Sequence, residues 1–354
     1  MAHVKMITIA TIIGARPQFI KAAPLSVEIA NSDQVRELCI HTGQHFDENM
    51  SGVFFRELGL PKPAYQLDIN GGPHGQMTGR MMEAIEAILM ENRPDGVLVY
   101  GDTNSTLAGG LVAAKLHIPL IHVEAGLRSY NRMMPEEINR VLVDHISSVL
   151  LCPTSAAVEN LKKEGINDGV HQVGDLMYDA TLKLTPVAVK HSRILDELAL
   201  EPKRYGVATL HRAENTDSPD ALRNAIGFLV QLSEEIPLIL PLHPRTRKAL
   251  SDAEIAVTGT RLKLIGPVGY FDMHVLLSNA SIVATDSGGV QKEAYFHRVP
   301  CVTLRSETEW VETIDNGWNR LWHVDEYRPR REIQEYGTGD TAQRILQILK
   351  SAQR

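Results

Sequence analysis

The sequence predicts an α/β fold built from two doubly wound parallel sheets, one in each half of the chain. Short, continuously apolar runs alternate with longer amphipathic stretches, which is the pattern of parallel strands covered by helices on both faces. The runs form two sets of about five, separated by a charged stretch between residues 175 and 204 that contains no clear strand. With 354 residues, the chain has room for two domains of ordinary size.

The expected strands are runs of β-branched and aliphatic residues that end at polar or turn-forming residues. They cover residues 6–13, 38–41, 96–100, 120–123 and 149–152, and then residues 206–210, 238–242, 262–265, 281–285 and 301–304. The clearest expected helices, chosen by apolar residues at helical spacing, cover residues 79–92, 136–148, 155–164, 220–235 and 341–352. We therefore predict an N-terminal domain over residues 1–180, a C-terminal domain over residues 200–340, and a last helix within residues 341–354 that crosses back to the N-terminal domain.

Composition and charge restrict the classes of function. The chain is 44% hydrophobic and 22% charged, which is typical of a soluble globular protein. A net charge of −7 argues against a general affinity for nucleic acid or membrane surfaces, and no apolar run is long enough to span a membrane. The N-terminus leads directly into a strand without a recognisable signal peptide, so we expect a cytoplasmic protein. Cys39, Cys152 and Cys301 lie within apolar runs and are expected to be reduced core thiols instead of disulfides or metal ligands.

The most informative segment runs from Asp286 to Glu293, between an expected strand and an expected helix. Gly288 and Gly289 permit a tight turn and a close approach of backbone N–H groups to a ligand, and the N-terminus of a helix attracts phosphate. Glu293 lies about one helical turn further on, where its carboxylate can accept hydrogen bonds from a ribose diol. The alternative is a plain strand-to-helix turn capped by Asp286 or Ser287. The first interpretation predicts a site for a nucleotide diphosphate.

Polar side chains directly follow six of the expected strands. Open parallel sheets bind their ligands beyond the carboxyl ends of the strands. The side chains at these ends are Arg16, Asp102, Glu124, His211, His243 and Arg305. Any one of them could belong to a helix cap or a surface loop, but six at the same end of their strands favour a ligand site.

The first half of the chain contributes the acids of this expected site, whereas the second half contributes histidines and an arginine. A cleft between the halves would place Asp102, Glu124 and Glu136 on one wall and the diphosphate site on the other. Neighbouring carboxylates in such a cleft can serve as general acid and base. Asp102 could instead cap a helix that starts near Asn104. Glu136 and Glu137 could simply be first-turn acids of a helix that begins at a proline, favoured by the helix dipole.

These segments together resemble the non-hydrolysing UDP-N-acetylglucosamine 2-epimerases over nearly the whole chain, from Ile12 to about Ile345. The matching motifs are residues 14–17 with Lys21, and residues 42–45, 101–103, 122–128, 135–140, 211–215, 286–289 and 336–340. The resemblance implies two Rossmann-like domains that face a cleft, which is the glycosyltransferase-B architecture. It also implies a UDP-sugar substrate and a homodimer.

The reaction that the resemblance implies inverts carbon 2 of the sugar by expelling UDP from carbon 1 while a base removes the hydrogen at carbon 2. UDP then adds back to the 2-acetamidoglucal, with a proton delivered to the opposite face. No cofactor or metal is expected, and the chain has no Gly-x-Gly-x-x-Gly after its first strand. Carried onto this chain, the catalytic positions are Asp102, Glu124, Glu136 and His211, with Asp102 and Glu124 as the proton-handling pair. The expected UDP-sugar contacts are Arg16, Lys21, His243, Ser287, Gly288, Gly289, Glu293 and Arg305.

Two segments depart from the usual pattern of the family. Residues 211–215 read His-Arg-Ala-Glu-Asn, and residues 305–312 read Arg-Ser-Glu-Thr-Glu-Trp-Val-Glu. The second variant resembles the branch that acts on UDP-2,3-diacetamido-2,3-dideoxyglucuronate, a precursor of surface polysaccharide. The carboxylate of that sugar needs a cation, for which Arg128, Arg305 and Arg320 are the candidates.

Other activities stay open at this point. Some bacterial members of the family bind a second nucleotide sugar as an activator, and the loop at residues 44–47 lacks the arginine associated with that behaviour. The same architecture serves UDP-sugar transferases, which pass the sugar to an acceptor. A hydrolysing 2-epimerase, which releases the free sugar, is the other alternative.

Overall fold

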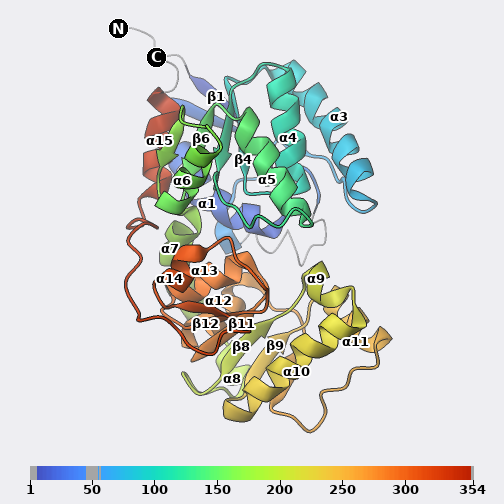
Figure 1. The fold of residues 1–354 in the computed structure, drawn as a ribbon. Helices are drawn as coiled ribbons and strands as arrows, with labels where there is room; N and C mark the ends of the chain where they lie inside the picture. The colour runs from blue at the N-terminus through green and yellow to red at the C-terminus, as the bar shows by residue number, and fades with distance from the viewer. Residues whose placement is uncertain (1–5, 45–54, 56, 352–354) are drawn as a thin grey trace. The chain divides into compact units, whose positions relative to one another are not determined.

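The computed structural model describes residues 6–44, 55 and 57–351 and shows two compact units, each built on its own parallel sheet (Figure 1). The first unit comprises Met1–Leu182 together with Gln334–Arg354, and the second comprises Lys183–Ile333. The α/β class predicted from the alternation of strands and helices is therefore confirmed. No helix in these described ranges is both long and apolar enough to cross a membrane.

The first unit contains a parallel sheet with the order β3-β2-β1-β4-β5-β6-β7. Its strands are β1 (Ile7–Ile13), β2 (Val35–His41), β3 (Tyr65–Gln66), β4 (Gly96–Tyr100), β5 (Leu120–Val123), β6 (Val149–Cys152) and β7 (Val170–Gln172). Its helices are α1 (Arg16–Ala30), α3 (His74–Asn92), α4 (Asn104–Lys115), α5 (Pro135–Ile146), α6 (Ser155–Lys163), the start of α7 (Leu176–His191), and α15 (Thr341–Ser351). All five strands predicted for this half are present.

The second unit repeats the arrangement with the parallel order β10-β9-β8-β11-β12-β13. Its strands are β8 (Gly206–Thr209), β9 (Leu238–Pro241), β10 (Leu262–Ile265), β11 (Ile282–Thr285), β12 (Cys301–Thr303) and β13 (Asn319–Leu321). Its helices are the end of α7, α8 (Ile194–Leu198), α9 (Ala213–Thr216), α10 (Pro219–Glu235), α11 (Pro244–Asp252), α12 (Tyr270–Asn279), α13 (Gly288–Phe296) and α14 (Val311–Asp315).

Both sheets reverse their strand order at one place, between β1 and β4 in the first sheet and between β8 and β11 in the second. At such a switch point the connecting loops leave in opposite directions and open a crevice at the carboxyl ends of the strands, where open α/β sheets bind ligands. The strands beside both switch points are almost completely buried, which fixes the loops that follow them.

The last segment of the chain packs with the first unit. The carbonyl oxygen of Tyr336 accepts a hydrogen bond from the N–H of Asp175 at 3.0 Å, and Asp179 Oδ2 accepts one from the N–H of Ala342 at 2.9 Å. Helix α15 then packs against α1. Residues 334–340, which the sequence placed with the C-terminal domain, therefore belong to the first unit.

Candidate active site

At the switch point of the first sheet, one buried amide ties the β1–α1 loop to the β4–α4 loop. The Oε1 of Gln18 accepts hydrogen bonds from the N–H groups of Gly14 (2.8 Å) and Ala15 (3.0 Å). Its Nε2 donates to the carbonyl oxygen of Tyr100 (2.9 Å) and to Oγ1 of Thr106 (3.0 Å). Because both the oxygen and the nitrogen of the Gln18 side-chain amide are hydrogen-bonded to these loops, the loops are held at a fixed separation. They carry Arg16 and Asp102, two of the residues expected in the site.

Asp102 does not cap helix α4, so that alternative is wrong. The cap is Thr103, whose side chain accepts from the N–H of Thr106 at 3.3 Å. Oδ2 of Asp102 instead accepts from the guanidinium of Arg140, with 2.5 Å to Nη2 and 3.2 Å to Nε. The Asp102 side chain is 29% exposed, whereas that of Arg140 is 2% exposed. The buried Arg140 thus orients the Asp102 carboxylate, which remains accessible to a ligand.

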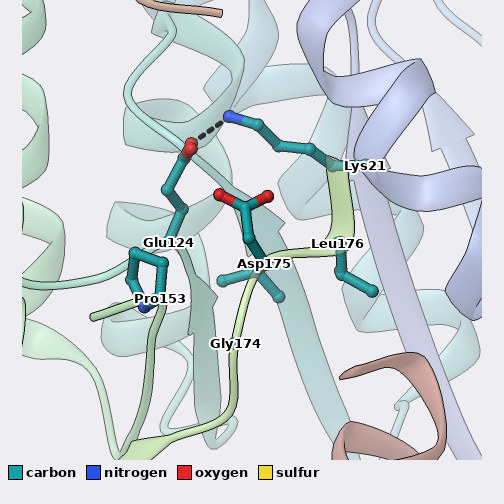
Figure 2. A pocket seen from close by; sticks show the side chains of 7 residues that line it. Lys21, Glu124, Pro153, Gly174, Asp175 and Leu176 are labelled. Atoms are coloured by element: carbon teal, nitrogen blue, oxygen red, sulfur yellow. Dashed lines mark hydrogen bonds and ion pairs between the residues drawn. The ribbon is translucent and has the colours of Figure 1, made fainter. Parts of the chain in front are cut away.

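Glu124 lies beside the same loop and forms an ion pair with Lys21 (Figure 2). The side chains of Lys21 and Glu124 are only 10% and 9% exposed. Gly101, with φ of 60°, approaches this pair so closely that a Cβ atom there would lie 3.2 Å from Glu124 Oε2 and 3.3 Å from Lys21 Nζ. Because Asp102 follows Gly101 directly, the structure brings the two expected proton-handling carboxylates and Lys21 to one loop cluster.

The backbone of Glu124 is itself unusual, with φ of 70°. A residue with a Cβ atom rarely adopts this left-handed conformation, which costs about 1–3 kcal/mol and is found where the surrounding structure enforces it, frequently at functional sites. Here the N–H groups of Glu124 and Ala125 both donate to the carbonyl oxygen of Leu151, at 3.0 and 3.2 Å. The turn after β5 is therefore pinned to the end of β6, with the Glu124 side chain directed at Lys21.

The two acids in the first turn of α5 differ completely in environment. Glu137 is buried and accepts from the N–H (2.9 Å) and Oγ (3.0 Å) of Ser129, the N–H of Tyr130 (2.9 Å) and Nη1 of Arg140 (2.6 Å). Glu136 is half-buried and makes no hydrogen bond or ion pair with any other residue that the structure describes. Glu137 is therefore a structural carboxylate, whereas Glu136 is the one accessible for chemistry.

A buried polar cluster holds the loops that carry Asp102 and Glu124. The ring of His122 contacts the carbonyl oxygen of Gly101 through Nε2 and Asp144 Oδ1 through Nδ1, both at 2.7 Å. Nη1 of Arg128 donates to Asp144 Oδ2 at 2.7 Å, and Nε and Nη2 of Arg128 each donate to one oxygen of Glu164 at 2.7 Å. Burial raises the pKa of the Asp144 carboxyl, but the charges and hydrogen bonds of His122 and Arg128 outweigh it and leave that pKa below its ordinary value. Arg128 is thus a structural residue and is removed from the candidates for binding a substrate carboxylate.

At the switch point of the second sheet, a fully buried carboxylate holds the β8–α9 loop. Oδ2 of Asp286 accepts from the N–H groups of His211 (2.9 Å) and Arg212 (2.8 Å) and from Nδ2 of Asn215 (3.2 Å). Its Oδ1 lies 3.3 Å from Nδ1 of His211. The residue that caps α13 is Ser287, which accepts from the N–H of Val290 at 3.5 Å. Asp286 therefore orients His211 instead of starting the helix.

His211 and His243 lie next to each other, with ring centroids 6.0 Å apart. Nδ1 of His243 accepts from the N–H of Arg245 at 3.2 Å, so the neutral ring carries its proton on Nε2 and can donate it to a ligand oxygen. Nδ1 of His211 faces Asp286, which leaves Nε2 of that ring as the nitrogen directed away from the carboxylate. The pair thus offers a hydrogen-bond donor and an oriented acid-base group at the expected diphosphate site.

Several expected contacts gather around the start of α13. A Cβ atom at Gly288 would lie 2.5 Å from Glu309 Oε1 and 3.1 Å from Trp310 Nε1, so a larger residue there would have to displace the Glu309 carboxylate of the β12–α14 loop. Glu309 is held by Arg305 at 2.9 Å, and the Arg305 side chain is completely buried. Gly289 follows in the first turn of the helix, and Glu293 lies on the same helix and is nearly buried. Residues 45–47 lie outside the described residues. They belong to the loop whose sequence bears on activation by a second nucleotide sugar.

The match to known proteins covers almost the whole chain. Residues 27–350 match the sequence model of the family described as UDP-N-acetylglucosamine 2-epimerase. The chain belongs to the UDP-N-acetylglucosamine 2-epimerase family. This confirms the resemblance on which the sequence-based assignment rests, and as a member of this family the chain is an isomerase.

Relatives in this epimerase family extend from end to end of the chain. It is 51% identical to a UDP-N-acetylglucosamine 2-epimerase homolog of Methanococcus maripaludis, over 97% of this chain and 99% of that protein. It is 48% identical to the UDP-2,3-diacetamido-2,3-dideoxy-D-glucuronate 2-epimerase of Pseudomonas aeruginosa, over 96% of this chain and 99% of that protein. The crystal structure of the Methanocaldococcus jannaschii UDP-GlcNAc 2-epimerase in complex with UDP-GlcNAc and UDP matches with a TM-score of 0.91 and 41% identity, over 98% of this chain and 100% of that one.

Sequence reasoning about this epimerase missed one acid at the edge of the first sheet. Asp175 follows the short strand β7 and lines the same pocket as Lys21 and Glu124 (Figure 2). The rule that polar residues just after a parallel strand belong to the ligand site could have found Asp175. Strand β7 ends at Gln172, and Asp175 lies three residues further along the chain. It was missed because β7 has three residues, none of them fully buried, and gives no apolar run.

Proposed function

We propose that this enzyme interconverts the two carbon 2 epimers of a UDP-N-acetylhexosamine without hydrolysing it. The observation that carries the proposal is the placement of Asp102, Glu124 and Lys21 around Gly101 at the switch point of the first sheet. The second support is the Asp286–His211 pair at the switch point of the second sheet. One edge offers carboxylates for proton transfer, and the other offers groups suited to a diphosphate.

The proposed reaction has two halves. A carboxylate accepts the hydrogen of carbon 2 as a proton, the C–H electrons form a double bond between carbons 1 and 2, and the electrons of the bond from carbon 1 to oxygen leave with UDP. In the second half, the electrons of the double bond take up a proton that a carboxylic acid delivers to carbon 2 from the other face, while an oxygen of UDP re-forms its bond to carbon 1. Asp102 and Glu124 are the proposed pair, because general acid-base groups must lie within reach of the same carbon.

The remaining residues are assigned to the leaving group and the sugar. His211 and His243 are proposed to contact the diphosphate, and their donors would stabilise the charge that develops on UDP as it leaves. Ser287, Gly288 and Gly289 are proposed to contact it through the N-terminus of α13, and Glu293 the ribose. Arg16, Lys21 and Arg305 are the remaining proposed contacts, and Glu136 is proposed to assist proton transfer.

The sugar is proposed to be the 2,3-diacetamido-2,3-dideoxyglucuronate, with N-acetylglucosamine as the alternative. The support is the named activity of the Pseudomonas relative and the variant segment at residues 305–312. That sugar would make the product a precursor of surface polysaccharide. From the family resemblance we also infer that the enzyme is a cytoplasmic homodimer, which sedimentation of the purified protein and cell fractionation would test.

Deuterium exchange tests the reaction and the substrate together. The protein is incubated in D2O with UDP-N-acetylglucosamine and, separately, with the diacetamido-uronate nucleotide, and the products are followed by NMR. We expect deuterium at carbon 2 of a product still linked to UDP, with the uronate exchanged faster. UDP plus free sugar would identify a hydrolysing enzyme instead. No exchange with either nucleotide would contradict the proposal and favour a transferase.

Substitution of the two adjacent glutamates should separate chemistry from stability. We expect Glu136→Gln to lower kcat by about 10²-fold or more, the usual size of a general acid-base contribution, without changing the melting temperature. We expect Glu137→Gln to lower the free energy of unfolding by about 1–3 kcal/mol, because its buried carboxylate accepts four hydrogen bonds. Steady-state kinetics and thermal unfolding of both variants make the comparison. The reverse pattern would exchange the roles assigned to the two residues.

A further inference from the structure

A small pocket at the carboxyl edge of the first sheet contains one ammonium group and two carboxylates (Figure 2). It is lined by Lys21, Val123, Glu124, Pro153, Gly174, Asp175 and Leu176. Lys21 comes from α1, whereas the others follow or end β5, β6 and β7, which are neighbours in the sheet. The pocket thus belongs to the edge at which the reaction is proposed to occur, and Asp175 is the acid in it to which no role has been given.

Asp175 has a structural contact that would by itself explain an acid at this position. Its Oδ1 accepts from the N–H of Met177 at 2.7 Å and so caps the start of α7. Asn and Ser cap helices as well as Asp does, so capping alone does not require a charge here. Figure 2 shows the Asp175 carboxylate directed into the pocket that also holds the Lys21–Glu124 ion pair. With a relative exposure of 4%, it is buried, and a buried carboxylate calls for a cation nearby.

The charges of the pocket change when Glu124 takes up a proton. Lys21, Glu124 and Asp175 line one pocket, in which Lys21 forms its ion pair with Glu124. Asp102, one residue beyond the adjoining Gly101, is already paired with Arg140. If Glu124 becomes a neutral acid, Lys21 loses the partner with which it is paired at rest. A buried ammonium without a counter-ion is costly, so proton uptake by Glu124 would be opposed unless another carboxylate serves Lys21.

We propose that Asp175 is a positioning residue of the reaction, the second carboxylate partner of Lys21, which keeps that ammonium neutralised while Glu124 carries the proton of carbon 2. The proposal rests on the proposed function, since it assigns Glu124 to proton transfer. Its consequence is that the pocket passes from a net charge of −1 to neutral when the proton arrives, instead of from neutral to +1. Asp175 touches neither the reacting carbon nor UDP in this scheme and acts only through its charge, on Lys21 and Glu124.

The decisive variant is Asp175→Asn, because asparagine keeps the size of the side chain and the cap of α7 while removing the charge. A neighbouring charge shifts the proton affinity of a carboxylate by about one to three pKa units, so we expect kcat to fall by about 10- to 1000-fold, with a much smaller change in KM. Removal of a negative neighbour also makes Glu124 easier to ionise. The acidic limb of the pH–kcat profile, which reports the ionisation of Glu124, should therefore move to lower pH.

Two further variants separate the charge from the cap. Asp175→Glu restores the charge on a longer side chain, and we expect it to return the limb toward the wild-type pH and to recover part of kcat. Asp179→Asn is the matched control, since Asp179 is a buried acid one turn further along α7 that holds the N–H of Ala342 and does not line the pocket. It should lower the melting temperature and leave the pH profile in place.

The outcomes distinguish this inference from the proposed function. Deuterium exchange by the wild type, together with a wild-type kcat and pH profile for Asp175→Asn, would overturn the role of Asp175 alone. That role would also be overturned if Asp175→Glu were as slow as Asp175→Asn, because the cap geometry and not the charge would then matter. Absence of exchange in the wild type would overturn the proposed function and this inference with it.

Discussion

Replacing Asp102 with Asn is expected to reduce exchange at carbon 2 by about 10³-fold or more while UDP still binds. An amide cannot accept the proton, and general acid-base groups contribute about 10²- to 10⁴-fold to turnover. The fold should survive, because helix α4 is capped by Thr103 and Arg140 keeps its contact with Glu137 at 2.6 Å. Exchange is measured by NMR in D2O, UDP binding by calorimetry, and integrity by thermal unfolding.

The matched control for this variant is Thr103→Ala, one residue further along the same loop. Loss of its cap should lower the free energy of unfolding by about 1 kcal/mol and leave exchange measurable. If Thr103→Ala lost exchange as completely as Asp102→Asn, the sensitivity of the loop to any disturbance would explain both results. Unchanged turnover in Asp102→Asn would remove Asp102 from the proton-handling pair.

Most of the fold could be predicted because buried parallel strands are recognisable in the sequence as short apolar runs. The ranges predicted for β4, β5, β6 and β10 agree with the structure residue for residue. The strands that escaped prediction are β3, β7 and β13, which have only two or three residues and lie at the edges of their sheets. An edge strand is covered on fewer sides, so its residues need not be apolar, and its hydrogen bonds to one neighbour leave no signal in the sequence.

The candidate site was predictable to the level of loops, but not to the level of partners. The rule that ligands bind at the carboxyl ends of parallel strands places Asp102, Glu124 and His211 correctly at such ends. The sequence could not tell that Glu137 is structural while Glu136 is accessible, since both occupy the same turn. Nor could the sequence show that the guanidinium of Arg128 is paired with Asp144 and Glu164. These two acids lie 16 and 36 residues further along the chain, and only the fold brings them to Arg128.

The two sheets share one principle of construction. At each switch point a buried polar side chain spans the two loops that leave in opposite directions, Gln18 in the first unit and Asp286 in the second. Buried groups of this kind have to find partners, so they fix the loop geometry more strictly than apolar packing would. The residues proposed for chemistry are therefore held by neighbours whose roles are structural, and substitutions of those neighbours should be costly.

Replacing Asp144 with Asn should produce the largest loss of stability among these structural residues. Asp144 is completely buried and accepts from His122 and Arg128 at 2.7 Å each and from the N–H of Gly126 at 3.1 Å. An amide would direct its NH2 group at one of these donors and leave Arg128 with Glu164 alone. Removal of one member of a buried ionic cluster costs about 3–5 kcal/mol. Urea unfolding, with the midpoint and slope compared, measures the loss.

The pH dependence of this difference supplies a second test with a definite sign. The pKa of Asp144 is depressed in the folded protein, so its stabilising contribution is fully present above the unfolded pKa of about 3.9 and is lost as the pH falls through the folded value. The stability gap between the wild type and Asp144→Asn should therefore be constant near neutral pH and narrow only in acid. The exposed ion pair of Asp220 with Arg223 offers a control, because Asp220→Asn should leave stability unchanged. A gap that is absent at neutral pH, or that widens as the pH falls, would show that the Asp144 carboxylate does not hold the loops that carry Asp102 and Glu124.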